Sequence, residues 1–97
     1  MNSILQTTKK CYVSGAGGAL HKHHIYGGPN RRVSEANGFW VYLKPELHNL
    51  SNIGVHFNRE LDLKLKRDCQ REYEKTHTRA EFMALIGRNY LEEEEDV

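Results

Sequence analysis

The sequence has little that could span a membrane or cross-link the chain. Its mean hydropathy is −0.74, and no apolar run approaches the roughly 20 residues that a membrane-spanning helix needs. Its two cysteines, Cys11 and Cys69, lie far apart, so we expect two free thiols, with a single disulfide between them as the alternative. The first residues also lack the pattern of a signal peptide. These absences predict a cytoplasmic protein with no membrane partner.

The chain is short for a protein that folds on hydrophobic burial alone. With 97 residues, of which 38% are hydrophobic, it has room for one small core and no second domain. Domains of this size often gain stability from a bound metal, disulfides or a partner. The six histidines are therefore the first candidates for a functional site.

Charge is distributed unevenly along the chain. The net charge is +1, but residues 92–96 are all acidic, and without those five charges residues 1–91 carry +6. A basic body attracts polyanions such as nucleic acid, by a force that salt weakens; a solvated surface of mixed sign is the alternative. The acidic residues repel one another, so 92–97 are expected to form a disordered tail. Residues 1–8 are expected to form a flexible arm.

Strand signals are concentrated in the first half of the chain. Three glycines between 15 and 18 predict a turn between a short strand at 10–13 and a longer strand at 19–26. The aromatic, β-branched and aliphatic residues 39–43, bounded by Gly38 and Pro45, give the clearest strand signal. We therefore expect a hairpin over residues 20–43, with 31–37 as a polar loop or a single helical turn in its long connection.

Helix signals dominate the second half. Apolar or aromatic residues recur there at every fourth position, namely Phe57, Leu61, Leu65, Cys69 and Tyr73. This spacing predicts one helix that ends near residue 77. The segment Thr78-Arg-Ala-Glu81 matches a capping box that opens a second helix, 79–86, which Gly87 ends. The expected fold class is α+β, with a β-hairpin, a long helix and a short C-terminal helix.

Adjacent histidines end the first strand of the expected hairpin. Alternation along a strand sends His21 and His23 to one face and His24 to the other. One imidazole can then bind a divalent metal while its neighbour accepts a proton from water, as metal-assisted hydrolysis of phosphodiesters requires. His48 and His56 follow the second strand and lie near the start of the long helix, so they are candidates for further ligands.

The remaining histidines and aromatics are expected to be structural. His21 and His77 are isolated from this arrangement and are interpreted as ordinary surface or core residues. Trp40 and Tyr42 could stack on bases, but strand aromatics in a small core are more often buried.

Several sequence blocks occur in a familiar order. They are His23–Gly28, Arg31-Arg32, Ser34-Glu35, Val41–Leu43, His48-Asn49, Gly54–Asn58, Gln70 and Ile86–Leu91. In these blocks the chain resembles the small HNH-type endonuclease-like proteins of phages and prophages, over roughly residues 10–91. The resemblance implies a ββα-metal (HNH or His-Me finger) core in a single domain, residues 9–91. It also implies metal-dependent hydrolysis of phosphodiester bonds in DNA, in the host cell cytoplasm.

The same resemblance implies roles for the histidines. His24 looks like the general base that activates water. His23, His48 and His56 look like ligands of one divalent ion, which would be Mg²⁺, Mn²⁺, Ni²⁺ or Zn²⁺. Asn37 is a candidate brace for the histidine segment, and action as a homodimer is compatible with the family.

Basic residues near the histidines are candidate contacts to nucleic acid. Lys22, Arg31 and Arg32 are expected to meet phosphate oxygens, because charged donors bind phosphate strongly. Solvated loop charges are the alternative interpretation.

The sequence departs from the family at one corner. Relatives often carry a structural zinc held by two CxxC-like pairs, but here only Cys11 remains, and Ser14, Lys44 and Leu47 occupy the partner positions. These cannot complete a thiolate site, so no structural zinc is expected. This loss and the acidic tail motivate an alternative function, a catalytically inactive HNH-scaffold binding protein such as a phage inhibitor of a host defence nuclease. A DNA-binding module without hydrolysis is a third hypothesis.

Overall fold

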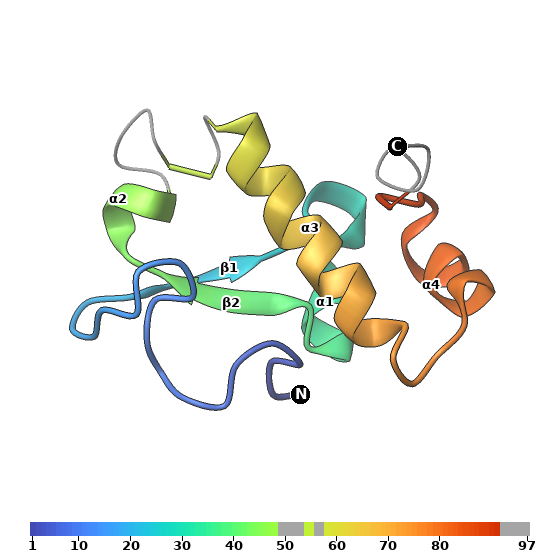
Figure 1. Cartoon of the computed structure of the whole chain (residues 1–97), viewed down its shortest axis with the longest axis horizontal. Coiled ribbons are helices and arrows are strands. Elements are labelled where there is room, and N and C mark those ends of the chain that lie inside the picture. The colour runs from blue at the N-terminus through green and yellow to red at the C-terminus, as the bar shows by residue number, and fades with distance from the viewer. Residues whose placement is uncertain (49–53, 56–57, 92–97) are drawn as a thin grey trace.

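The fold is α+β and is built around one antiparallel strand pair (Figure 1). A computed structural model describes residues 1–48, 54–55 and 58–91. In chain order the elements are β1 (His21–His24), the 3₁₀ helix η1 (Gly28–Asn30), α1 (Arg31–Asn37), β2 (Trp40–Leu43), α2 (Pro45–His48), α3 (Arg59–Tyr73) and α4 (Arg79–Ile86). The expected α+β class is confirmed, and the segment 31–37 is a helix of two turns.

The strands pair in a register that fixes the histidines. His23 lies opposite Val41 and His24 opposite Trp40. β1 is shorter than the predicted strand 19–26. The predicted strand at 10–13 is wrong, because Cys11 closes a local loop: its N–H donates to the Ala16 carbonyl at 2.8 Å and its carbonyl accepts from Gly15 at 2.8 Å. Those backbone groups are therefore not available for a ladder.

Residues 1–8, predicted to be a flexible arm, make specific contacts with β2 and the residues before it. Ser3 Oγ donates to the Trp40 carbonyl at 2.6 Å, and the Ile4 N–H donates to the Gly38 carbonyl at 3.0 Å. The Tyr42 N–H donates to Gln6 Oε1 at 2.8 Å. The arm thus satisfies edge groups of a sheet that has only two strands. Gly38 has φ 74° and would place a Cβ against the Asn2 backbone, so this approach requires glycine.

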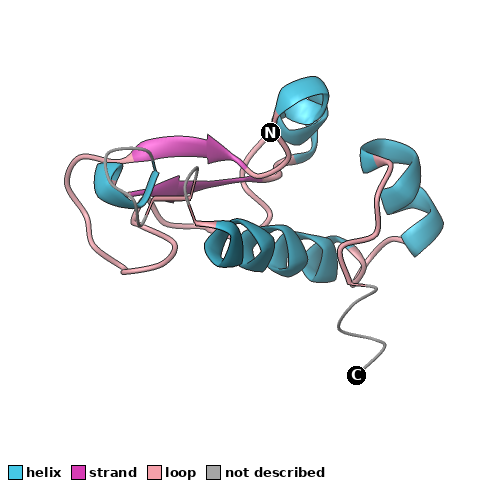
Figure 2. Ribbon diagram, turned by 90° about the horizontal axis from the view of Figure 1, so that it is seen from above, coloured by secondary structure: helices cyan, strands magenta, loops and turns pink. Residues whose placement is uncertain are grey.

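The core lies between the hairpin and the two C-terminal helices (Figure 2). Phe39 packs edge-on against Tyr73 of α3, with ring centroids 5.4 Å apart, and Tyr26 packs against Phe82 of α4 at 5.6 Å. Leu65 and Cys69 are fully buried, as the four-residue spacing predicts. Phe57, the first residue of that pattern, lies outside the described residues, as does the acidic tail 92–97.

Both helix starts have the capping chemistry that their sequences indicate. Asn58 caps α3 by accepting from the Leu61 N–H at 3.1 Å. Thr78 and Glu81 form the predicted capping box, and Gly87 ends α4 with φ 85°. α3 ends at Tyr73 rather than near residue 77.

The two thiols are free and buried, as predicted. Burial raises the pKa of Cys69 to about 12. None of the helices in the described part of the chain is long and apolar enough to cross a membrane.

Candidate functional site

The hairpin presents its histidines on two faces, as strand alternation requires. On one face His21 and His23 meet α2: His21 Nδ1 lies 3.0 Å from His48 Nδ1. The ring centroids of His23 and His48 are 5.3 Å apart. His23 is buried, at 5% exposure. Two of the predicted metal ligands, His23 and His48, are therefore neighbours.

Neutral imidazole is a common metal ligand, and the rings of His23 and His48 are in edge-on contact, with an interplanar angle of 65°. The third predicted ligand, His56, lies outside the described residues. Within residues 1–48, 54–55 and 58–91, no three His, Cys, Asp or Glu side chains are arranged to hold a metal ion.

The other face of β1 carries a hydrogen-bonded triad with α1, made by Lys22, His24 and Glu35. His24 Nε2 lies 3.0 Å from Glu35 Oε2, and Lys22 Nζ lies 2.8 Å from the same oxygen. Hydrogen bonds from Lys22 and then from His24 hold the pKa of the Glu35 carboxyl below its usual value. Lys22 also lies over the ring of Trp40, 4.2 Å from its centroid. Glu35 is thus an ionised partner that fixes both basic side chains.

The position of Glu35 depends on a buried serine one residue earlier. Ser34 is fully buried. Its Oγ donates to the Tyr26 carbonyl at 2.7 Å and accepts from the Tyr26 N–H at 3.2 Å. These two bonds attach α1 to the segment that follows β1. They hold Glu35 within reach of His24.

Five of the predicted site residues line one pocket of about 270 Å³. They are Lys22, His23, His24, Arg31 and His48, joined by Gly27 and Gly28. Arg32 is exposed on α1 and is not among the lining residues. Asn37, the candidate brace, donates from Nδ2 within α1 to the Val33 carbonyl at 2.8 Å.

Cys11 lies near residues that the sequence analysis placed in one corner of the fold. Burial raises the pKa of the Cys11 thiol, but hydrogen bonds with Ser14 and the Lys44 backbone outweigh it, so the net pKa is lowered. Leu47 packs against the same core cluster. Ser14 and Lys44 therefore lie beside Cys11.

Sequence reasoning missed two members of this site. His21 was interpreted as an isolated histidine, although the alternation that puts it on the face of His23 was the available signal. Glu35 belongs to one of the sequence blocks that carry the resemblance, but the sequence analysis assigns it no role in the site. Its position one turn into a polar helix gave no indication that it would face His24.

Comparisons with protein-family models, with curated proteins and with solved structures find no match to this chain.

Proposed function

We propose that this protein is a metal-dependent endonuclease that hydrolyses phosphodiester bonds in DNA. The observation that carries the proposal is the shared pocket, in which His23, His24 and His48 lie together with Lys22 and Arg31. Histidines that can bind a metal, a histidine paired with a carboxylate, and two cations are the groups that such hydrolysis uses. The order of the hairpin and then α3 also agrees with a ββα-metal core.

His24 is proposed as the general base. An ionised carboxylate only accepts hydrogen bonds, so the bond to Glu35 at 3.0 Å places the ring proton on His24 Nε2. The lone pair of the neutral ring is then on Nδ1, where it can accept a proton from water. Glu35 acts as the orienting third group, as in other base-assisted nucleophiles.

His23 and His48 would hold the metal ion, with His56 as the third proposed ligand. Such an ion stabilises negative charge on the scissile phosphate and on the leaving oxygen. The contact between the Nδ1 atoms of His21 and His48, at 3.0 Å, requires one of the two to donate. If His48 donates, its Nε2 lone pair is available to a metal, and His21 is the outer partner that sets this tautomer.

The cations would position the substrate backbone. Lys22 is held by Glu35 and by the Trp40 ring, so its side chain would lose little further conformational entropy on binding a phosphate. Arg31 lines the same pocket from the start of α1 and can bind a phosphate through two N–H groups. Arg32, outside the pocket, would contact a flanking phosphate.

Separate readouts test these roles. His24→Ala is expected to keep Mn²⁺ binding, measured by calorimetry, and to lose cleavage of plasmid DNA. His23→Ala is expected to weaken Mn²⁺ binding itself. His77→Ala is the matched control, since His77 stacks on Tyr73 with centroids 4.0 Å apart and is not among the pocket-lining residues. Full cleavage by His24→Ala protein would overturn the assignment of the base. Wild-type protein that binds a partner protein but cuts nothing would favour the inactive-scaffold alternative.

A further inference from the structure

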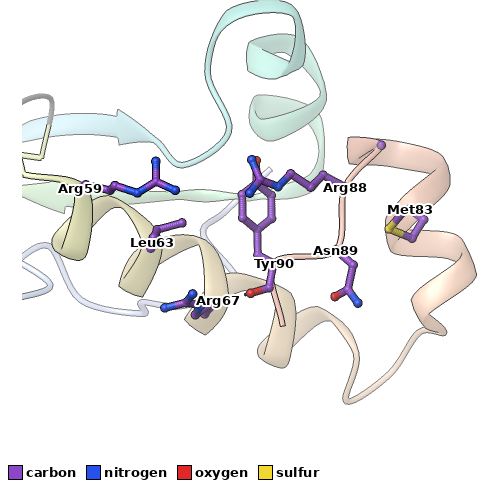
Figure 3. A pocket seen from close by; sticks show the side chains of 8 residues that line it. Arg59, Leu63, Arg67, Met83, Arg88, Asn89 and Tyr90 are labelled. Carbon is purple, nitrogen blue, oxygen red and sulfur yellow. Dashed lines mark hydrogen bonds between the residues drawn. The ribbon is translucent and has the colours of Figure 1, made fainter. Parts of the chain in front are cut away.

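A second pocket, on the side of the molecule where α3 and α4 meet, is lined by three arginines (Figure 3). They are Arg59 at the start of α3, Arg67 two turns later, and Arg88 just after α4. The pocket has a volume of about 280 Å³, and none of the described residues that line it is an aspartate or a glutamate. Three arginines therefore line one hollow, and its described lining contains no carboxylate.

This arrangement differs from that of three lysines on α3 or just after it. Lys64, Lys66 and Lys75 each pair with a carboxylate three or four residues away, at 2.7–2.8 Å. Arg59 and Arg88, by contrast, form no ion pair with any residue that the structure describes, and both are exposed. A cation in the first turn of a helix also opposes the helix dipole, so Arg59 is not placed there to stabilise α3.

The pocket is held in shape by a buried side chain. Gln70 is fully buried; its Nε2 donates to Asn89 Oδ1 at 2.8 Å, and its Oε1 accepts from the Tyr90 N–H at 2.8 Å. Arg67 Nε donates to the Tyr90 carbonyl at 3.1 Å. The segment that carries Arg88 is therefore fixed to α3 before any ligand arrives.

Tyr90 gives this pocket an aromatic wall between its cations. The Arg88 guanidinium lies over the Tyr90 ring, 4.9 Å from its centroid. Arg59 and Arg88 extend toward one another from α3 and from the segment after α4 (Figure 3). Guanidinium groups bind phosphate oxygens in pairs of parallel hydrogen bonds, so an anion of phosphate size is the ligand that this geometry fits.

One buried aromatic joins the two pockets. Tyr26 follows His24 by two residues. Its hydroxyl donates to the Lys66 carbonyl of α3 at 2.6 Å, and its ring centroid is 5.6 Å from that of Tyr90. A nucleic acid strand carries one phosphate roughly every 3.4 Å of helix axis, so the ligand must be a strand long enough to reach both pockets.

We infer that the pocket of Arg59, Arg67 and Arg88 binds a backbone phosphate of the nucleic acid whose scissile phosphate lies at the histidine pocket. This inference rests on the proposed function for the identity of the ligand. It assigns the α3/α4 side of the molecule as the place where the strand is anchored away from the cut.

The test measures binding in EDTA, so that neither a metal nor cleavage is involved. The probe is a fluorescein-labelled 20-base-pair DNA duplex, followed by fluorescence anisotropy at several salt concentrations. The double variant Arg59→Gln/Arg88→Gln is compared with Lys64→Gln/Lys75→Gln. The control removes the same charge from lysines that are 63% and 68% exposed and already paired.

The arginine variant is expected to lose about tenfold or more in affinity and to reduce the salt slope by nearly two, since each phosphate contact contributes about 0.9. The control is expected to change affinity less than about twofold. Equal losses in both variants would show a general charge effect and overturn the site. If the arginine variant binds the duplex as tightly as wild type but has lost binding of inorganic phosphate, the pocket is a small-anion site, and this result would also overturn the inference. Because this test does not measure cleavage, a negative result does not bear on the proposed nuclease activity. The test can also be carried out if the protein proves to have no nuclease activity.

Discussion

Removing the Ser34 hydroxyl should destabilise the protein far more than the size of the change suggests. Ser34 is fully buried, and its Oγ satisfies both the N–H and the carbonyl of Tyr26. Ser34→Ala leaves two backbone groups without this partner in a region that excludes water. A buried polar group that loses its partner costs about 1–3 kcal/mol, so the expected loss for the pair is about 2–4 kcal/mol.

Urea denaturation followed by far-UV circular dichroism measures this loss. For a domain of this size, with an m-value of about 1.5 kcal/mol/M, the midpoint should fall by about 1.3–2.7 M. Thr7→Ala, which removes a hydroxyl from an exposed residue of the arm, is the control and should shift the midpoint by less than about 0.3 M. If Ser34→Ala shifts the midpoint no more than this control, the attachment of α1 to the segment after β1 does not stabilise the fold, and the positioning of Glu35 needs another cause.

Three further predictions concern other parts of the molecule. Because the pKa of Glu35 is lowered in the folded state, its stabilising effect is present above the ordinary value of 4.5 and is lost as the pH falls through the folded pKa. The thermal stabilities of wild type and Glu35→Gln should therefore differ at pH 6 and converge in acid. A difference that grows in acid would contradict the contacts of Glu35 with Lys22 and His24. Thr78→Ala removes the capping box of α4 and should lower the free energy of unfolding by about 0.5–2 kcal/mol, whereas the exposed Thr8→Ala should not. The triple variant Ser14→Cys/Lys44→Cys/Leu47→Cys should bind one Zn²⁺ per chain, detected by competition with a chromophoric chelator, and failure to bind would show that the corner around Cys11 lacks the geometry of a four-thiolate zinc site.

Local patterns in the sequence predicted α3 and α4, but they did not predict α2. The four-residue spacing from Leu61 to Tyr73 and the Thr78 to Glu81 box depend on neighbours within one or two turns, so the sequence contains all the information that they need. β2 was equally clear because five apolar residues stand between Gly38 and Pro45. The strand at 10–13 failed because both backbone groups of Cys11 bond within the loop 11–16, which no periodicity reveals, and among the described backbone hydrogen bonds of this segment only that of the Tyr12 N–H reaches β2, at the Tyr42 carbonyl.

The site was predictable only where it depended on strand alternation. Alternation put His21 and His23 on one face, and both contact His48. The contact of His24 with Glu35 is set by the docking of α1, which depends on the bonds of Ser34 to Tyr26. The arginine pocket brings together residues 59 and 88, and Gln70 fixes the segment after α4 through its bonds to Asn89 and Tyr90. Such long-range contacts are set by tertiary packing, so local sequence patterns do not predict them.

The central claim is tested most directly by incubating supercoiled plasmid with purified protein, in EDTA or with Mg²⁺, Mn²⁺, Ni²⁺ or Zn²⁺, and separating the products on an agarose gel. The account predicts nicked plasmid with wild-type protein and a divalent metal, and uncut plasmid in EDTA and with folded His24→Ala protein. Uncut plasmid with folded wild-type protein in every metal would contradict it, as would equal nicking by His24→Ala.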